Sequence, residues 1–147
     1  MIYTEQPDGF IPDIEVVGCL VLSSDKILLL HRHDHKPHGD KWGIPAGKRD
    51  DVDDNRNIAM LRELREETGL VLEEKDLSFY KTFFVEHPGL NFLYHYHLVN
   101  LDKIPDVVIA EKEHKAFSWV TIDEALKMPL VPDEDFCLKD YCIHTIN

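Results

Sequence analysis

The stretch that decides the fold runs from Gly47 to Leu70 and reads GKRDDVDDNRNIAMLRELREETGL. From about Asn55 to Thr68, apolar residues recur at steps of three and four, which is the period of an amphipathic helix, and Gly69 follows as a C-terminal stop. The pattern therefore predicts a helix over residues 55–68. Its apolar side is expected to carry Ile58, Met60, Leu61, Leu64 and Thr68.

Carboxylates gather on the other side of this expected helix. At about 100° per residue, Glu63, Glu66 and Glu67 share one arc with Arg62, and Ala59 leaves a bare patch between them. Like charges at these spacings cost a few tenths of a kcal/mol per pair, so helix propensity does not favour the cluster. A hard divalent cation does favour it, because Mg²⁺ takes oxygen ligands and commonly joins carboxylates to substrate phosphates.

The same stretch resembles a known family. RELREETGL, with Gly47 upstream, is similar to the Nudix box, G-x5-E-x7-R-E-U-x-E-E-x-G-U, in which U is an aliphatic residue. Counting back from Arg62 puts the first Glu of that pattern at Asp54, seven residues after Gly47 rather than six. One residue is thus inserted, and Asp stands in place of Glu. We expect Asp53 or Asp54 to brace this loop less well than Glu, or to cap the helix.

The resemblance implies an α/β fold, the Nudix-type α/β/α sandwich with a mixed β-sheet between helices. It implies an enzyme, a pyrophosphohydrolase that cleaves a diphosphate linkage in a nucleoside triphosphate or in a nucleoside diphosphate linked to another group. The implied cofactor is Mg²⁺ or Mn²⁺. The implied metal ligands are the Gly47 carbonyl and the carboxylates of Glu63, Glu66 and Glu67.

Catalytic roles follow from the same resemblance. Arg62 is expected to orient the carboxylates of Glu63 and Glu66 through charge-assisted hydrogen bonds. The proton acceptor is either a helix glutamate, Glu63 or Glu66, or Glu113, which lies in a loop before a later strand. The alternative for Glu113 is an ordinary solvated charge.

The net charge of the chain limits the kinds of partner that it is expected to bind. With 147 residues and a formal net charge of −12, it is expected to be one domain that binds neither nucleic acid nor an anionic membrane surface. A small-molecule nucleoside diphosphate derivative is the expected partner of a monomer or homodimer. Its phosphates must be met locally, by metal and by a few cations, for which the candidates are Arg32, Lys41, Lys48 and Arg62.

Three cysteines without a C-x-x-C spacing favour a reducing cytoplasm over a disulfide framework. The N-terminus has neither a basic start nor an apolar run, so we expect no leader and no membrane span.

The remaining chain predicts a sheet and two further helices, of which the first opens at Thr121 with a capping box to Glu124. Residues 1–13 are expected to be a lead-in that packs loosely, ahead of a single domain over residues 14–147. Buried strands without clean alternation indicate a sheet covered on both faces. The expected strands are residues 14–22, 26–32, 77–87, 90–100 and 117–120, and the expected C-terminal helix lies over residues 133–147, with Phe136, Leu138, Tyr141, Cys142 and Ile146 mostly on one face.

Two further patterns each leave two readings open. His31, His33 and His35 alternate, which predicts either a zinc site or the polar rim of a cleft. The aromatic residues of the two central strands either fill the core or stack a nucleobase. They are Phe79, Phe83, Phe92 and Tyr94.

Two functional rivals also stand beside the hydrolase. A Nudix-fold nucleotide-binding or regulatory module without turnover would keep the sandwich and lose the metal site. A purely structural protein would use the acidic face only as a solvated helix surface.

Overall fold

The structure is a computed structural model that describes residues 1–145. The helices are α1 Arg56–Thr68, α2 Ile122–Ala125 and α3 Glu134–Thr145, with a short 3₁₀ turn, η1, over Glu74–Asp76. The strands are β1 Ile2–Tyr3, β2 Ile14–Ser23, β3 Lys26–Arg32, β4 Trp42–Gly43, β5 Ala46–Lys48, β6 Ser78–His87, β7 Leu90–Leu101 and β8 His114–Thr121.

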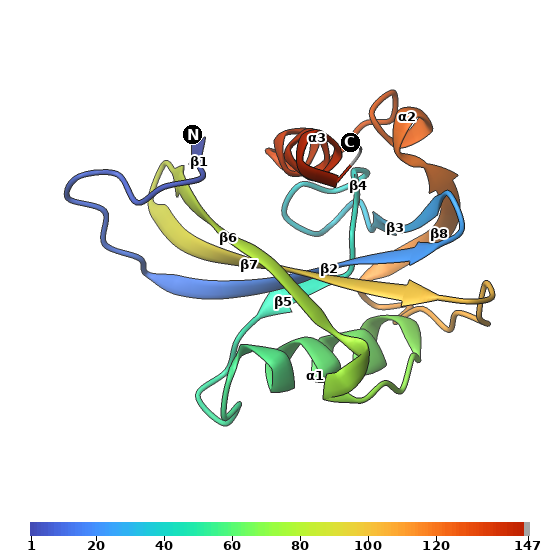
Figure 1. Cartoon of the computed structure of the whole chain (residues 1–147). Helices are drawn as coiled ribbons and strands as arrows, with labels where there is room; N and C mark the ends of the chain where they lie inside the picture. Colours follow the sequence, from blue (N-terminus) through green and yellow to red (C-terminus); the bar gives the residue numbers. More distant parts are fainter. Residues whose placement is uncertain (146–147) are drawn as a thin grey trace.

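The strands form one mixed sheet in the order β1-β6-β7-β2-β3-β4, with β5 paired to β2 and β8 paired to β3. The long central pair, β2 and β7, is parallel, and the other pairs are antiparallel. Helix α1 covers one side of this sheet, and α2 and α3 lie on the other (Figure 1). The predicted α/β/α sandwich with a mixed sheet is therefore confirmed.

Residues of β2 alternate between two cores, which explains its largely apolar sequence. Cys19 and Val21 face α1 and pack in one cluster with Met60 and Leu64. Leu20 belongs to the second cluster, with side chains of α2 and α3. Since a residue on either face of the strand is out of water, no polar alternation is required.

Helix α1 has both of its ends fixed by local chemistry. The Asn55 side chain accepts a hydrogen bond from the Ile58 N–H at 3.0 Å, which makes Asn55 the N-cap. Gly69 adopts a left-handed conformation with φ 76°, and its N–H donates to the Arg65 carbonyl. The predicted span agrees within one residue, but the expectation that Asp53 or Asp54 caps the helix is wrong.

The lead-in at residues 1–13 is not loose. Ile2 and Tyr3 pair with Val85 and Phe84 of β6, and Phe10 is buried edge-on against the Phe84 ring, with centroids 5.5 Å apart. Pairing of this kind covers the outer edge of β6, whose backbone groups would otherwise lack partners.

The C-terminal half departs from prediction at two places. Strand β8 begins at His114, three residues before the expected start, because its ladder with β3 continues to Arg32. Helix α3 buries a face centred on Cys137 and Leu138, whereas Phe136 is 39% exposed. Ile146, expected on the apolar face, lies outside the described residues.

Among the described residues, no helix is both long enough and apolar enough to cross a bilayer.

Candidate active site

The acidic arc of α1 faces the protein more than solvent. Ala59, Glu63 and Glu67 form a column at four-residue spacing, and their exposed fractions are 0%, 9% and 4%. Ala59 packs in the α1 core, so the bare patch predicted between carboxylates does not exist. Only Glu66 of the three glutamates is exposed. The helix period located this arc correctly but could not show that strand β5 lies over it.

Strand β5 contacts two of the buried carboxylates directly. A Cβ atom added at Gly47 would collide with the Glu63 carboxylate, so only glycine permits this close approach of backbone to side chain. The neighbouring Ala46 N–H donates to Oε2 of Glu67 at 3.1 Å. The structure therefore brings Gly47 close to Glu63, another member of the predicted metal set, and their binding of metal stays a prediction.

Arg62 is the hub that joins the helix to the preceding loop. Its Nη1 donates to Glu63 at 2.9 Å and to Glu66 at 3.2 Å. Its Nε and Nη2 donate to the two oxygens of Asp53 at 3.1 and 2.9 Å, and Nη2 also donates to the Lys48 carbonyl. The guanidinium thus holds two of the predicted metal ligands in place by charge-assisted hydrogen bonds.

The insertion before the helix is absorbed on the helix side of Asp53. Asp53 lies six residues after Gly47, which is the spacing of the Nudix pattern, and its side chain is 3% exposed. It also accepts the Asp50 N–H at 2.8 Å. Arg62 holds the Asp53 pKa below its usual range. Asp54, the position found by counting back from the helix, is exposed instead.

The electrostatics of the buried glutamates fit a cation. Burial, followed by repulsion from Glu63 and Glu113, raises the Glu67 pKa well above its usual value, against the Ala46 N–H and Arg32. Burial also raises the Glu63 pKa, and Arg62 only partly opposes it. Carboxylates that are buried, mutually repelling and short of donors are costly to ionise. A divalent ion would supply the missing positive charge, so the chemistry of these carboxylates fits Mg²⁺ or Mn²⁺.

Glu113 lies on the opposite wall of the same site. A cavity of about 320 Å³ is lined by Glu66 and Glu67 from α1 and by residues 110–113 from the loop before β8. Within residues 1–145, no three acidic, imidazole or thiol groups are arranged as a ready-made metal cage.

Of the four candidate phosphate-binding cations, two line a common cavity. Arg32 and Lys48 border a space of about 370 Å³ that also reaches Gly47. Lys41 is exposed, is absent from that lining, and meets Arg32 through the backbone, where the Arg32 N–H donates to the Lys41 carbonyl at 2.9 Å. The structure therefore does not bring Lys41 into the cavity, because its place before β4 directs it to solvent.

The alternating histidines do not converge on a metal. His31 stacks on the Trp42 ring with centroids 4.2 Å apart and pairs with Asp40 at 2.9 Å. His33 contacts the Glu111 carbonyl through Nε2, and its backbone N–H donates to the Glu113 carbonyl at 3.1 Å. This segment supports the Glu113 loop, which favours the polar-rim reading over the zinc site.

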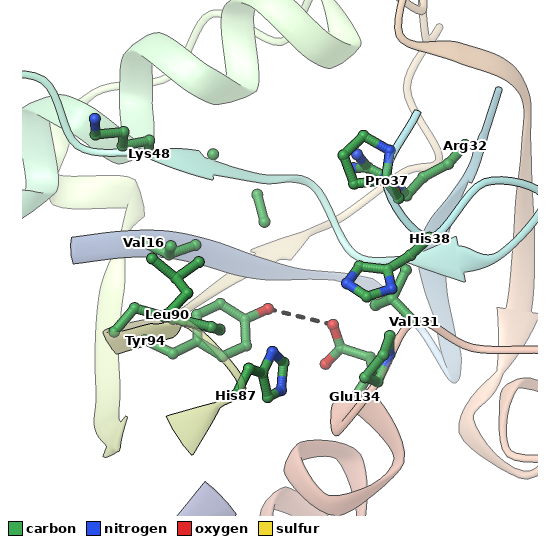
Figure 2. Close-up of a pocket in the computed structure, with 14 residues that line it drawn as sticks. Val16, Arg32, Pro37, His38, Lys48, His87, Leu90, Tyr94, Val131 and Glu134 are labelled. Atoms are coloured by element: carbon green, nitrogen blue, oxygen red, sulfur yellow. Dashed lines mark hydrogen bonds between the residues drawn. The ribbon is translucent and has the colours of Figure 1, made fainter. Parts of the chain in front are cut away.

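One buried acid was not identified from the sequence. Glu134, the first residue of α3, is 2% exposed and accepts the hydroxyl groups of Tyr94 at 3.2 Å and Tyr96 at 3.0 Å. Figure 2 shows the hydrogen bond between this carboxylate and the Tyr94 hydroxyl, and both residues line the 370 Å³ cavity. The available signal is the pair of tyrosines two apart on one strand, of which the sequence predicts only that Tyr94 fills the core or stacks a nucleobase.

Comparison with known proteins identifies the family of this chain. The family model of the NUDIX domain matches residues 13–141, and the chain belongs to the Nudix family. A CTP pyrophosphohydrolase of Escherichia coli (strain K12) is 31% identical over 121 residues, which cover 81% of this chain and 84% of that protein. The uncharacterized Nudix hydrolase YvcI of Bacillus subtilis (strain 168) is 26% identical over 130 residues, or 84% and 78% of the two chains.

Solved structures support the same fold. The NUDIX domain of Shewanella oneidensis NrtR, complexed with ADP ribose, matches with a TM-score of 0.77 and 19% identity, over 93% of this chain and 91% of that chain. The solution structure of the E. coli ORF135 protein matches with a TM-score of 0.74 and 26% identity, over 97% and 100%.

Proposed function

We propose that this protein hydrolyses a diphosphate linkage in a nucleoside triphosphate or in another nucleoside diphosphate derivative, with bound Mg²⁺ or Mn²⁺. The observation that carries the proposal is the carboxylate group of α1, where Glu63 and Glu67 are buried against β5 and Glu66 opens into the cavity that Glu113 borders. The likeness to a CTP pyrophosphohydrolase supports the reaction class.

Different residues of the chain have different roles in this proposed reaction. A divalent ion, when bound, neutralises the diphosphate and lowers the pKa of a coordinated water. Glu63, Glu66 and Glu67, with the Gly47 carbonyl, hold that ion, and Arg62 positions the first two. Lys48, next to Gly47 in the adjoining cavity, is placed to meet phosphate oxygens, and Arg32 borders the part of that cavity that contains Glu134. The proton acceptor is a helix glutamate or Glu113, which lies across the cavity from α1.

The test is metal-dependent turnover across a panel of anhydrides: nucleoside triphosphates, nucleoside diphosphate sugars, ADP-ribose, dinucleoside polyphosphates and NADH. We expect product from at least one of them, dependent on Mg²⁺ or Mn²⁺ and abolished by Glu67→Gln. Binding of a nucleotide without any turnover would instead support the binding module. The cytoplasmic location stays a prediction, and the free thiols of Cys19, Cys137 and Cys142 support it.

A further inference from the structure

The 370 Å³ cavity beside the metal site has the form of a ring-binding pocket. It begins at Gly47 and Lys48, and Figure 2 shows Lys48 at one side and Glu134, His38 and His87 grouped away from it. Its walls between these ends are largely apolar, which suits a flat heteroaromatic ring. The apolar lining includes Val16, Leu90, Phe92, Val131 and Pro132.

The acid at the far end is held in a fixed orientation. Tyr94 and Tyr96 donate to different oxygens of Glu134, so the carboxylate plane cannot rotate freely. Gly18 makes this arrangement possible, because a Cβ atom there would lie 2.6 Å from the Tyr94 hydroxyl oxygen. Two buried hydroxyl donors and a glycine that clears space for one of them indicate a built site rather than a chance contact.

The carboxylate keeps acceptor capacity for a ligand. An ionised carboxylate has about four lone-pair positions, and the two tyrosine hydroxyls and the Ile44 backbone N–H use three of them. Both oxygens act as acceptors in these bonds, so the complementary ligand group is a hydrogen-bond donor. On a nucleobase, the donor that projects furthest from the ring is an exocyclic amino group.

A second observation points to a ligand or water at the same place. Behind Glu134 lies a smaller cavity of about 80 Å³, which shares Arg32, Tyr94 and Glu134 with the larger one. His114 borders it and is only 5% exposed, and its Nδ1 has no hydrogen-bond partner among the described residues. Burial lowers the His114 pKa to about 4, so its ring is neutral near pH 7. A buried polar atom of this kind calls for a partner.

We propose that this cavity binds the nucleobase of the substrate and that Glu134 selects a base carrying an exocyclic amino group, of the cytosine or adenine type, over the corresponding oxo base. The inference rests on the proposed function, because the Gly47 and Lys48 end of the cavity is the end assigned to phosphate.

Matched nucleotide pairs test the selection without any cleavage. CMP and UMP, and likewise AMP and IMP, differ in whether an amino or an oxo group occupies one ring position, and none contains an anhydride. Affinities are measured by calorimetry at pH 8, above the Glu134 pKa of about 7. In at least one pair, the amino member should bind about tenfold tighter or more, the scale of a hydrogen bond to a charged group.

Variants assign the preference to one side chain. Glu134→Gln keeps the shape and offers a donor that suits an oxo base, so it should bring the amino-to-oxo ratio within about twofold of unity. Asp135→Asn removes a carboxylate from the next, exposed residue of α3 and should leave the ratio unchanged. Equal binding within both pairs by the wild-type protein, tighter binding of the oxo members, or a ratio that survives in Glu134→Gln would each overturn the inference.

The two proposals fail separately. Metal-dependent turnover reports the hydrolase, whereas monophosphate affinities report the base pocket. Turnover without an amino preference would refute only the pocket assignment. An amino preference that depends on Glu134, in a protein with no turnover on any anhydride, would refute only the hydrolase.

Discussion

Asp53→Asn and Asp54→Asn, the two substitutions in the inserted loop, should differ strongly in their effects on stability and on turnover. Asp53 receives two hydrogen bonds from Arg62 and one from the Asp50 N–H, and its side chain is 3% exposed. Asparagine at this position keeps one oxygen and places an amide donor against the guanidinium. Asp54→Asn changes an exposed carboxylate.

The magnitudes follow from burial and from the number of bonds lost. A hydrogen bond to a charged group contributes about 1.5–3 kcal/mol, and Asp53→Asn should lower the free energy of unfolding by about that amount. An exposed substitution away from such contacts usually stays within about 0.5 kcal/mol, which is our expectation for Asp54→Asn. In Asp53→Asn the Arg62 guanidinium loses the negative charge of Asp53 and is held less firmly beside Glu63 and Glu66. The substitution should therefore also lower kcat by about tenfold, the scale of one lost charge-assisted contact.

Urea denaturation without metal measures the stability term, and turnover at saturating Mg²⁺ measures the rate. A Mg²⁺ titration of each variant adds a second readout, because loosened ligands should need more metal to reach half-maximal activity in Asp53→Asn alone. Equal destabilisation by the two variants would refute the assignment of Asp53 as the brace. So would a larger rate effect from Asp54→Asn, since the structure leaves that side chain in solvent.

Three further outcomes are expected. Glu67→Gln should lower kcat at least ~100-fold through loss of metal activation, while its melting temperature without metal does not fall, because a costly buried charge is removed; a clear drop in that temperature would contradict this account. Gly47→Ala should lower kcat about 100-fold, since the added methyl overlaps the Glu63 carboxylate and displaces a ligand; near wild-type kinetics would show that β5 moves freely. Glu134, with a pKa of about 7 against an ordinary 4.5, should favour folding fully below pH 4.5 and lose about 3 kcal/mol of that contribution as pH rises through 7. Urea midpoints between pH 4.5 and 8 should show this slope in the wild-type protein, and Glu134→Gln should flatten it.

The acidic helix could be predicted because its signals are local. Apolar periodicity, a terminal glycine and the carboxylate spacing all lie within residues 55–70, and the structure places α1 there. The burial of Glu63 and Glu67 could not be predicted in the same way. It depends on β5, a strand of three residues in a stretch that Pro and Gly make look like loop.

The brace illustrates a second limit. Counting back from a helix assumes that the connection enters it at a fixed spacing, and the count led to Asp54. The chain instead turns at Asp50–Asp53, where the Asp53 N–H donates to the Asp50 carbonyl at 3.0 Å. The inserted residue therefore lies between Asp53 and the N-cap residue Asn55. Sequence spacing identified the loop but could not show on which side of the acid the insertion falls.

Strand β5 links the chemistry of the site to its recognition. Its Ala46 and Gly47 touch the Glu67 and Glu63 carboxylates of α1, and the same two residues line the cavity that contains Glu134. A substrate that spans both regions must cross this strand, with its phosphates toward α1 and its ring toward α3. Since Glu134 is held by tyrosines of β7 and not by β5, its exchange alters which ring is bound and leaves the carboxylates of α1 in place. Substitutions at Glu134 should therefore change kcat/KM ratios between bases, whereas substitutions of the α1 glutamates should lower kcat for every base alike.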